Sequence, residues 1–145
     1  MSKETFRVLV TGSRKWKDQD TIRKTLDIVA EQALRAGCSQ VVVVHGCAPG
    51  ADIMADYWAR NRRQLWPLTA ERHPADWRQY GKAAGIRRNR EMVKAGADVC
   101  LAFVLDDSKG ATQCGELAER EGIPTRWFKQ YSTNPPGETD GREGN

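Results

Sequence analysis

Four consecutive valines, Val41–Val44, run directly into the segment HGCAPGAD at residues 45–52, and this junction constrains the fold more than any other stretch. The valine run is short, β-branched and apolar on both faces, which is typical of a parallel strand covered by helices. Apolar residues then recur at helical spacing over residues 51–59. A strand, a tight turn and a helix in this order place free backbone N–H groups at the turn, where they form an anion site.

The same unit recurs on both sides of this junction. Residues 6–11 form a short apolar run that ends at Gly12, and a helix capped by Asp18 or Asp20 follows as far as Gly37. The remaining predicted elements are strands at 66–70, 98–104 and 123–128 and helices at 82–95 and 112–121. Strands that alternate with helices predict an α/β fold, a Rossmann-like three-layer sandwich with a mostly parallel five-stranded sheet.

The length of 145 residues and the ordinary apolar content predict one folded domain over residues 1–129. Residues 130–145 have almost nothing to bury, and we expect a disordered tail. No window approaches the roughly 20 apolar residues of a membrane span, which predicts a cytoplasmic protein without a membrane partner. Four cysteines lie far apart and are expected to be reduced. We expect no metal site, since the best candidate group, Cys47 with His45 and His73, matches no zinc spacing.

In open parallel sheets, ligands bind outside the carboxyl ends of the strands. This rule predicts that three loops converge on one ligand: Gly12–Arg14, Gly46–Asp52 and Asp106–Thr112. The net charge of +4 favours an anionic partner. Charge alone does not distinguish a phosphorylated small molecule from nucleic acid.

Individual residues of the first two loops suit an oxyanion. Gly12, Ser13 and Arg14 offer backbone N–H groups, a hydroxyl and a cation. In the second loop two glycines permit close backbone approach and Pro49 stiffens the turn. Asp52 either stabilises the helix start or accepts a hydrogen bond from a ribose hydroxyl, as acidic residues do in dinucleotide-binding folds.

The run Arg87-Arg88-Asn89-Arg90 lies on a predicted helix. Successive residues of a helix point about 100° apart, so the three arginines cannot all face the ligand. One of them reaches it, and the others face water or a partner subunit. Trp16, Trp77 and Tyr80 lie in or beside predicted loops, where an aromatic face either stacks on a base or packs within the protein.

Several short segments occur together in a fixed order. They are VLVTGSRKW at 8–16, HGCAPGAD at 45–52, PADW at 74–77, GIRRNREM at 85–92, GATQC at 110–114 and GIP at 122–124. Together they resemble the YspA group of the SLOG superfamily over roughly residues 6–128. The resemblance implies a Rossmann-like fold that binds nucleotides or nucleotide-derived ligands such as ADP-ribose species. It also implies a bacterial or phage context.

The SLOG superfamily includes the LOG phosphoribohydrolases, whose resemblance implies a homodimer and an N-glycosidic hydrolysis. LOG enzymes carry an arginine–lysine pair on the third helix and a loop P-G-G-x-G-T-x-x-E. Arg88 matches the arginine, whereas Asn89 replaces the lysine. If Thr112 matches the family threonine, Gly115 occupies the glutamate position and Glu116 follows one residue late. The LOG pattern is therefore incomplete here.

Our leading hypothesis is a protein that binds a phosphorylated nucleoside or an ADP-ribose-like ligand, as a sensor, carrier or sequestering module. The predicted ligand-binding residues are Gly12, Ser13, Arg14, His45, Gly46, Pro49, Gly50, Ala51, Asp52, Arg88, Asn89, Gly110, Ala111 and Thr112. One alternative is a LOG-like hydrolase of nucleoside monophosphates with Arg88 and Glu116 as catalytic residues and Asp52 as a reserve carboxylate. A second is single-stranded DNA binding of the DprA kind by the basic helix, which ranks last.

Overall fold

The computed structural model describes residues 4–132 of the chain. The strands are β1 (Thr5–Gly12), β2 (Gln40–His45), β3 (Leu68–Arg72), β4 (Val99–Leu105) and β5 (Thr125–Gln130). The helices are α1 (Gln19–Arg35), α2 (Ala51–Arg62), α3 (Trp77–Tyr80), α4 (Ala84–Ala95) and α5 (Lys109–Arg120), with a 3-10 turn η1 (Gly81–Ala83) between α3 and α4. The alternation of strands and helices that the sequence predicts is confirmed.

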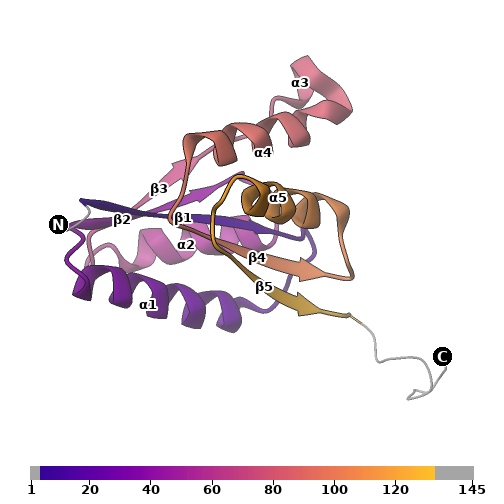
Figure 1. Cartoon of the computed structure of the whole chain (residues 1–145). Coiled ribbons are helices and arrows are strands. Elements are labelled where there is room, and N and C mark those ends of the chain that lie inside the picture. The colour runs from indigo at the N-terminus through magenta and orange to yellow at the C-terminus, as the bar shows by residue number, and fades with distance from the viewer. Residues whose placement is uncertain (1–3, 133–145) are drawn as a thin grey trace, which may run out of the picture.

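The five strands form one sheet in the order β3-β2-β1-β4-β5, and every neighbouring pair is parallel. Helices α1 and α2 cover one face of the sheet and α4 and α5 cover the other (Figure 1). The three-layer Rossmann-like fold is therefore confirmed, with a sheet that is wholly rather than mostly parallel. The strand order reverses at β1, between β2 and β4, and in such sheets the reversal opens a crevice for ligands.

Strand β1, at the centre of the sheet, and its neighbour β4 are the most deeply buried strands of the sheet. Val8, Leu9 and Val10 of β1 are fully buried, and each of the two faces of the sheet has its own apolar core against its pair of helices. Trp16 belongs to the α1–α2 core and packs edge-on against Phe103, with ring centroids 5.4 Å apart. Its indole is therefore unavailable to a base. Of the two roles considered for Trp16, packing within the protein is the one that the structure shows.

Most element boundaries differ from those predicted by one to three residues; β5, for example, begins at Thr125 and α4 at Ala84. β3 begins two residues later, at Leu68, because the carbonyl of Pro67 only starts the ladder by accepting from the amide of Val41. α5 begins at Lys109, three residues earlier, because Ser108 takes the extended conformation of a cap residue. The short helix α3 was not predicted; the Asp76 carboxylate caps it by accepting from the amide of Gln79.

The segment predicted as a tail starts within the fold. Gln130 is the last residue of β5, and the backbone and hydroxyl of Ser132 donate hydrogen bonds to the Asp106 carboxylate. Residues 133–145 lie outside the described part of the chain.

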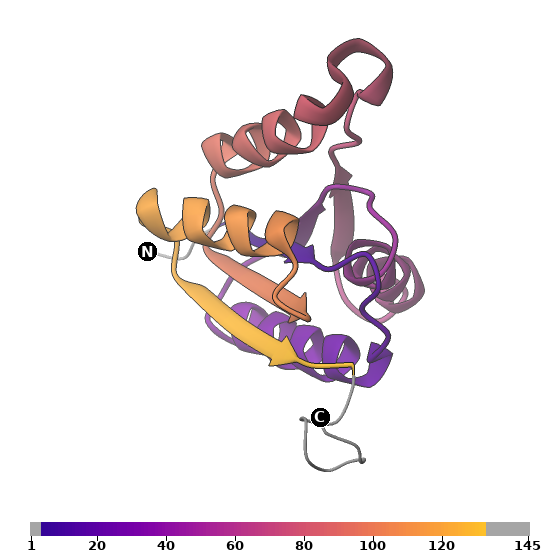
Figure 2. The same ribbon diagram turned by 90° about the vertical axis from the view of Figure 1, so that its right-hand side faces the viewer.

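Turned by 90°, the ribbon shows α3 and α4 standing over one edge of the sheet, away from α1 (Figure 2). Of the helices within residues 4–132, none has the length and apolar character that a membrane span requires.

Candidate functional site

A cavity of about 670 Å³ lies at the carboxyl ends of β1 and β4, between the first turn of α5 and helix α4. All three predicted loops contribute to its wall. Eight of the predicted binding residues line it: Gly12, Ser13, Arg14, Asp52, Arg88, Asn89, Gly110 and Ala111. Six lie beside it without forming the wall: His45, Gly46, Pro49, Gly50, Ala51 and Thr112.

The residues Gly50 and Ala51 join the first two loops. A Cβ atom at Gly50 would overlap the carbonyl oxygen of Ser13 and lie 2.6 Å from that of Arg14, and the φ angle of Gly50 is +85°. The Ala51 methyl group in turn fills the space that a side chain at Gly12 would need. These residues hold the two loops together, and neither of them forms part of the cavity wall.

Ser13 is committed to the protein itself. Its amide donates to the carbonyl of Phe103 at 2.9 Å, and its hydroxyl oxygen accepts from the amide of Leu105 at 2.7 Å and contacts the hydroxyl of Ser108. The side chain thus fixes the first loop to the end of β4 and the start of α5. Within residues 4–132, no acceptor pairs with the amides of Arg14 and Lys15, which are the donors this loop offers.

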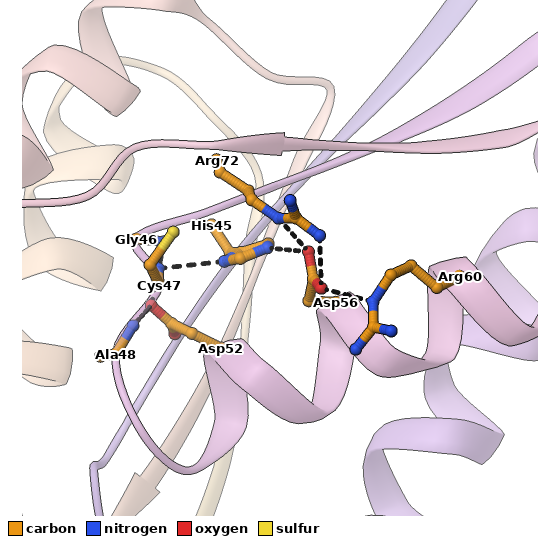
Figure 3. Close-up of polar contacts among 8 residues, drawn as sticks. All are labelled: His45, Gly46, Cys47, Ala48, Asp52, Asp56, Arg60 and Arg72. Carbon is orange, nitrogen blue, oxygen red and sulfur yellow. Dashed lines mark hydrogen bonds and ion pairs between the residues drawn. The ribbon is translucent and has the colours of Figure 1, made fainter.

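Asp52 shapes the second loop. Its Oδ2 accepts hydrogen bonds from the amides of Gly46 at 2.9 Å and Ala48 at 3.3 Å (Figure 3). Its Oδ1 is buried without a hydrogen-bond partner among the described residues. Burial raises the pKa of this carboxyl group to about 6, against the two amide hydrogen bonds and the charges of Arg88 and Arg14, which lower it. Asp52 both closes the loop and borders the cavity.

His45 supports the same loop from beneath. Its Nδ1 accepts from the amide of Cys47 at 3.0 Å, and its Nε2 bonds the carboxylate of Asp56 at 2.8 Å. Arg72 and Arg60 donate to the same carboxylate (Figure 3). Both imidazole nitrogens are thereby used, and within residues 4–132 no group of three His, Cys, Asp or Glu side chains is placed to hold a metal ion.

Arg88 is the arginine of the basic run that borders the cavity. Its Nη1 donates to the carbonyl of Gly46 and its Nε donates to Asn89 Oδ1 at 2.8 Å. A Cβ atom at Gly46 would lie 2.5 Å from that Nη1, so the glycine makes room for the guanidinium group. Asn89 in turn donates to Gln113 of α5 at 3.0 Å. Arg87 instead stacks over Tyr80, 3.9 Å from the ring centroid, while Arg90 is exposed.

The cavity wall carries more positive than negative charge. Two acidic side chains, Asp52 and Asp106, face five cationic residues: Arg14, Lys15, Lys82, Arg88 and Lys109. We did not predict Lys15, Lys82 and Lys109 as site residues. Lys109 lies within the third predicted loop and Lys15 directly follows the first, so their sequence positions already indicate this edge of the sheet. Nothing local in the sequence indicates that Lys82 or Gln113 lines the cavity.

Trp77 is the large aromatic side chain on this wall. It is 49% exposed, and the guanidinium carbon of Arg14 lies 5.4 Å from its ring centroid. Of the three aromatic residues singled out in the sequence, Trp77 therefore has a face available to a ligand, Trp16 is in the core and Tyr80 is covered by Arg87.

The two residues proposed for LOG-like catalysis are not brought together. Arg88 lines the cavity, but Glu116 is exposed on α5 and is not part of the wall. Gly115, at the family glutamate position, packs under Trp127, whose Cη2 would lie 2.5 Å from an added Cβ. Thr112 donates its hydroxyl to the carbonyl of Ser108 at 2.7 Å, which ties it to the helix start.

Comparison with known proteins identifies the family of the chain. The profile of the YspA, cpYpsA-related SLOG family (YAcAr) matches residues 6–80, which contain the first two loops and Trp77. The Gene 61 protein of Mycobacterium phage D29 is 51% identical over 119 residues, covering 81% of this chain and 92% of the phage protein. No solved structure matches the chain significantly. The chain belongs to the YspA, cpYpsA-related SLOG family.

Proposed function

We propose that this protein binds a nucleotide or a nucleotide derivative such as an ADP-ribose-like ligand in the cavity beside α5. The observation that carries the proposal is the convergence of five cationic side chains with the first turn of α5, to whose amides the cap residue Ser108 offers no side-chain acceptor, on one concave surface. Backbone amides at a helix start and nearby cations are the groups that hold phosphate in proteins.

The dimensions of the cavity support a ligand larger than a single phosphate. Its volume of about 670 Å³ falls within the roughly 300–1,000 Å³ that is usual for small-molecule sites. The wall combines charged groups with the apolar side chains of Trp77 and Ile86. A phosphorylated nucleoside has both kinds of surface.

The two alternatives receive less support. Hydrolysis of the LOG kind needs a carboxylate near the ribose, and Glu116 lies off the cavity wall. Asp52 borders the cavity but leaves only Oδ1 for a ligand, since its Oδ2 accepts from two amides of its own loop. Single-stranded nucleic acid binding favours an open basic groove with stacked aromatics. The basic residues of α4 instead diverge, with Arg88 in the cavity and Arg87 against Tyr80.

Calorimetric titration with AMP, ADP, ADP-ribose and NAD, with adenosine as the phosphate-free control, tests the proposal. Lys109→Gln removes a cavity cation and should weaken binding severalfold, to about tenfold. Arg90→Gln removes an exposed cation from α4 and should leave binding unchanged. Failure of every phosphorylated nucleoside to bind would defeat the proposal. Chromatography of the same mixtures would reveal free base if the hydrolase alternative were correct.

A further inference from the structure

We propose that the bound nucleotide takes one orientation, with its base against Trp77, a ribose hydroxyl at Asp52 Oδ1 and its phosphate at the start of α5. This inference rests on the proposed function and adds to it the orientation of the ligand and the residues that recognise its base and its ribose. Such a site distinguishes a ribonucleoside phosphate from a sugar phosphate and from a 2′- or 3′-deoxynucleotide.

The indole of Trp77 is held as a platform. The Asp76 cap fixes helix α3 by accepting from the amide of Gln79 at 3.0 Å. The Cη2 edge of the indole rests over Gly85, where an added Cβ would lie 3.4 Å away. About half of the side chain remains exposed on a concave wall beside Ile86. A rigid, exposed aromatic face in a cavity is suited to stacking a planar base.

Arg14 covers this face loosely. Its guanidinium carbon is 5.4 Å from the Trp77 centroid, compared with 3.9 Å for Arg87 over Tyr80. An entering base takes the position over the indole and leaves the Arg14 guanidinium free to pair with phosphate. A cation that exchanges an aromatic ring for a phosphate gains a charge-assisted hydrogen bond.

Asp52 requires a hydrogen-bond donor. The residue is 4% exposed and borders the cavity, and Oδ1 has no partner among residues 4–132 while Oδ2 has two. A buried acceptor without a partner is costly, and a ligand hydroxyl would supply the missing donor. A phosphate would be repelled. The charges of Arg88 and Arg14 lower the pKa of this carboxyl group, which favours the ionised acceptor form that a ligand hydroxyl needs.

The strand order sets the order of these contacts. Trp77 follows β3, Asp52 follows β2, the first loop follows β1 and the start of α5 follows β4. In the sheet these strands are neighbours in the order β3-β2-β1-β4. Along the edge of the sheet, Trp77 is therefore followed by Asp52 and then by the amides of the first loop and of the start of α5. This is the order in which base, ribose and phosphate follow one another in a nucleotide.

The first test compares AMP with ribose 5-phosphate by calorimetry. Loss of the base should weaken binding by about tenfold or more, since a stacked base contributes at least that factor. Trp77→Leu should abolish most of the difference between the two ligands. Tyr57→Leu, which removes an aromatic residue of similar exposure outside the cavity, should preserve it.

The second test compares AMP with its 2′-deoxy and 3′-deoxy forms. One of them should bind about tenfold more weakly than AMP, the factor expected for a hydrogen bond to a charged acceptor. In Asp52→Asn the amide oxygen must replace Oδ2 to keep the bonds from Gly46 and Ala48, which puts an N–H donor in place of Oδ1. The variant should therefore lose the discrimination.

The outcomes separate the two proposals. If AMP, ribose 5-phosphate and the deoxy forms bind the unmodified protein equally, the orientation is wrong while a phosphate-binding cavity remains. Discrimination that persists in Trp77→Leu or in Asp52→Asn would also overturn it. If no phosphorylated nucleoside binds, the orientation and the proposed function both fail. The comparison on the unmodified protein decides the matter even if a variant fails to fold.

Discussion

The buried imidazole of His45 donates a hydrogen bond from Nε2 to the carboxylate of Asp56 over 2.8 Å. The direction follows from the other ring nitrogen, because Nδ1 accepts the amide hydrogen of Cys47 and the remaining hydrogen must lie on Nε2. This pair places a positive-φ residue, Cys47, at the top of the second loop. The shape of the candidate site thus depends on a contact that lies beneath it (Figure 3).

Asp56→Asn should destabilise the protein by about 2–4 kcal/mol at pH 7, because a buried carboxylate that accepts from two arginines and from His45 loses its charge. Its hydrogen bonds with Arg72, His45 and Arg60 hold the pKa of Asp56 far below the ordinary value of 3.8. A lowered carboxyl pKa stabilises the fold above the ordinary value, and the effect is lost as pH falls toward the folded value. Urea denaturation at pH 7 and pH 3 should therefore show a smaller difference between variant and parent at pH 3.

A matched control is Asp20→Asn, whose carboxylate is exposed and pairs with Arg23. We expect a change within about 0.5 kcal/mol at either pH, as for an ordinary surface pair. An equal effect of the two substitutions at pH 7 would contradict the role assigned to Asp56.

Gly50→Ala should be strongly destabilising, by about 2 kcal/mol or more, since the new methyl group overlaps the Ser13 carbonyl and the φ angle is positive. Gly110→Ala makes the same chemical change in the first turn of α5, where no atom lies within 4 Å of the new Cβ. We expect it to be neutral or stabilising by up to about 1 kcal/mol. Thermal unfolding of the two variants gives the comparison. Similar losses at both positions would contradict the loop packing described here.

The sequence predicted the fold well because its signals are local. The Val41–Val44 run and the apolar residues 99–104 lie in strands covered by helices on both faces, and parallel pairing follows from the helices between them. Ligands of parallel sheets bind at the carboxyl ends of the strands, and this rule predicted that the three loops lie at one edge of the sheet. Element boundaries were less predictable where a cap decides them, as at Ser108 and Asp76.

The roles of side chains within the site were less predictable, because they depend on contacts between distant segments. Gly46 and Gly50 were recognised as sites of close approach, but what approaches them is Arg88 in one case and the Ser13 backbone in the other. His45 could be placed after a strand, yet its partner Asp56 lies on the next helix. No local pattern indicates that Asn89 bonds Gln113 across two helices.

Gly46→Ala should separate stability from binding. The new Cβ would lie 2.5 Å from Nη1 and 2.7 Å from both Cδ and Cζ of Arg88, so the outer part of this flexible side chain must move away. We expect a loss of stability below about 1.5 kcal/mol, but Arg88 would leave the carbonyl of Gly46 and change the cavity wall. Affinity for AMP should fall about fivefold or more if Arg88 contacts the phosphate.

Glu116→Gln serves as the control for this variant, because Glu116 is exposed on α5 outside the cavity. Calorimetry should show unchanged affinity for AMP. A drop in affinity for Glu116→Gln equal to that of Gly46→Ala would argue against the cavity as the binding site.

The free energy of unfolding of Asp52→Asn should increase, relative to that of the parent protein, as the pH rises from 4 to 7. Burial raises the pKa of Asp52 to about 6 from an ordinary value of 3.8. Between these values the folded protein holds a proton that the unfolded chain releases, so the stability of the parent falls as the pH rises. The difference between the two pKa values corresponds to a loss of stability of about 3 kcal/mol at most. The parent protein shows this loss in full above pH 6 and not at all below pH 4.

The asparagine variant has no such dependence at this position, since its side chain does not titrate. Its free energy of unfolding minus that of the parent should therefore increase by about 1–3 kcal/mol across this pH range. Taking the difference between the two proteins removes the contributions of Asp56, Glu71 and His45, which titrate in both. Urea denaturation at half-unit pH steps supplies the measurement. A difference that stays flat or declines with rising pH would show that Asp52 is not held in a costly ionised state, and that its Oδ1 already has a donor in solution.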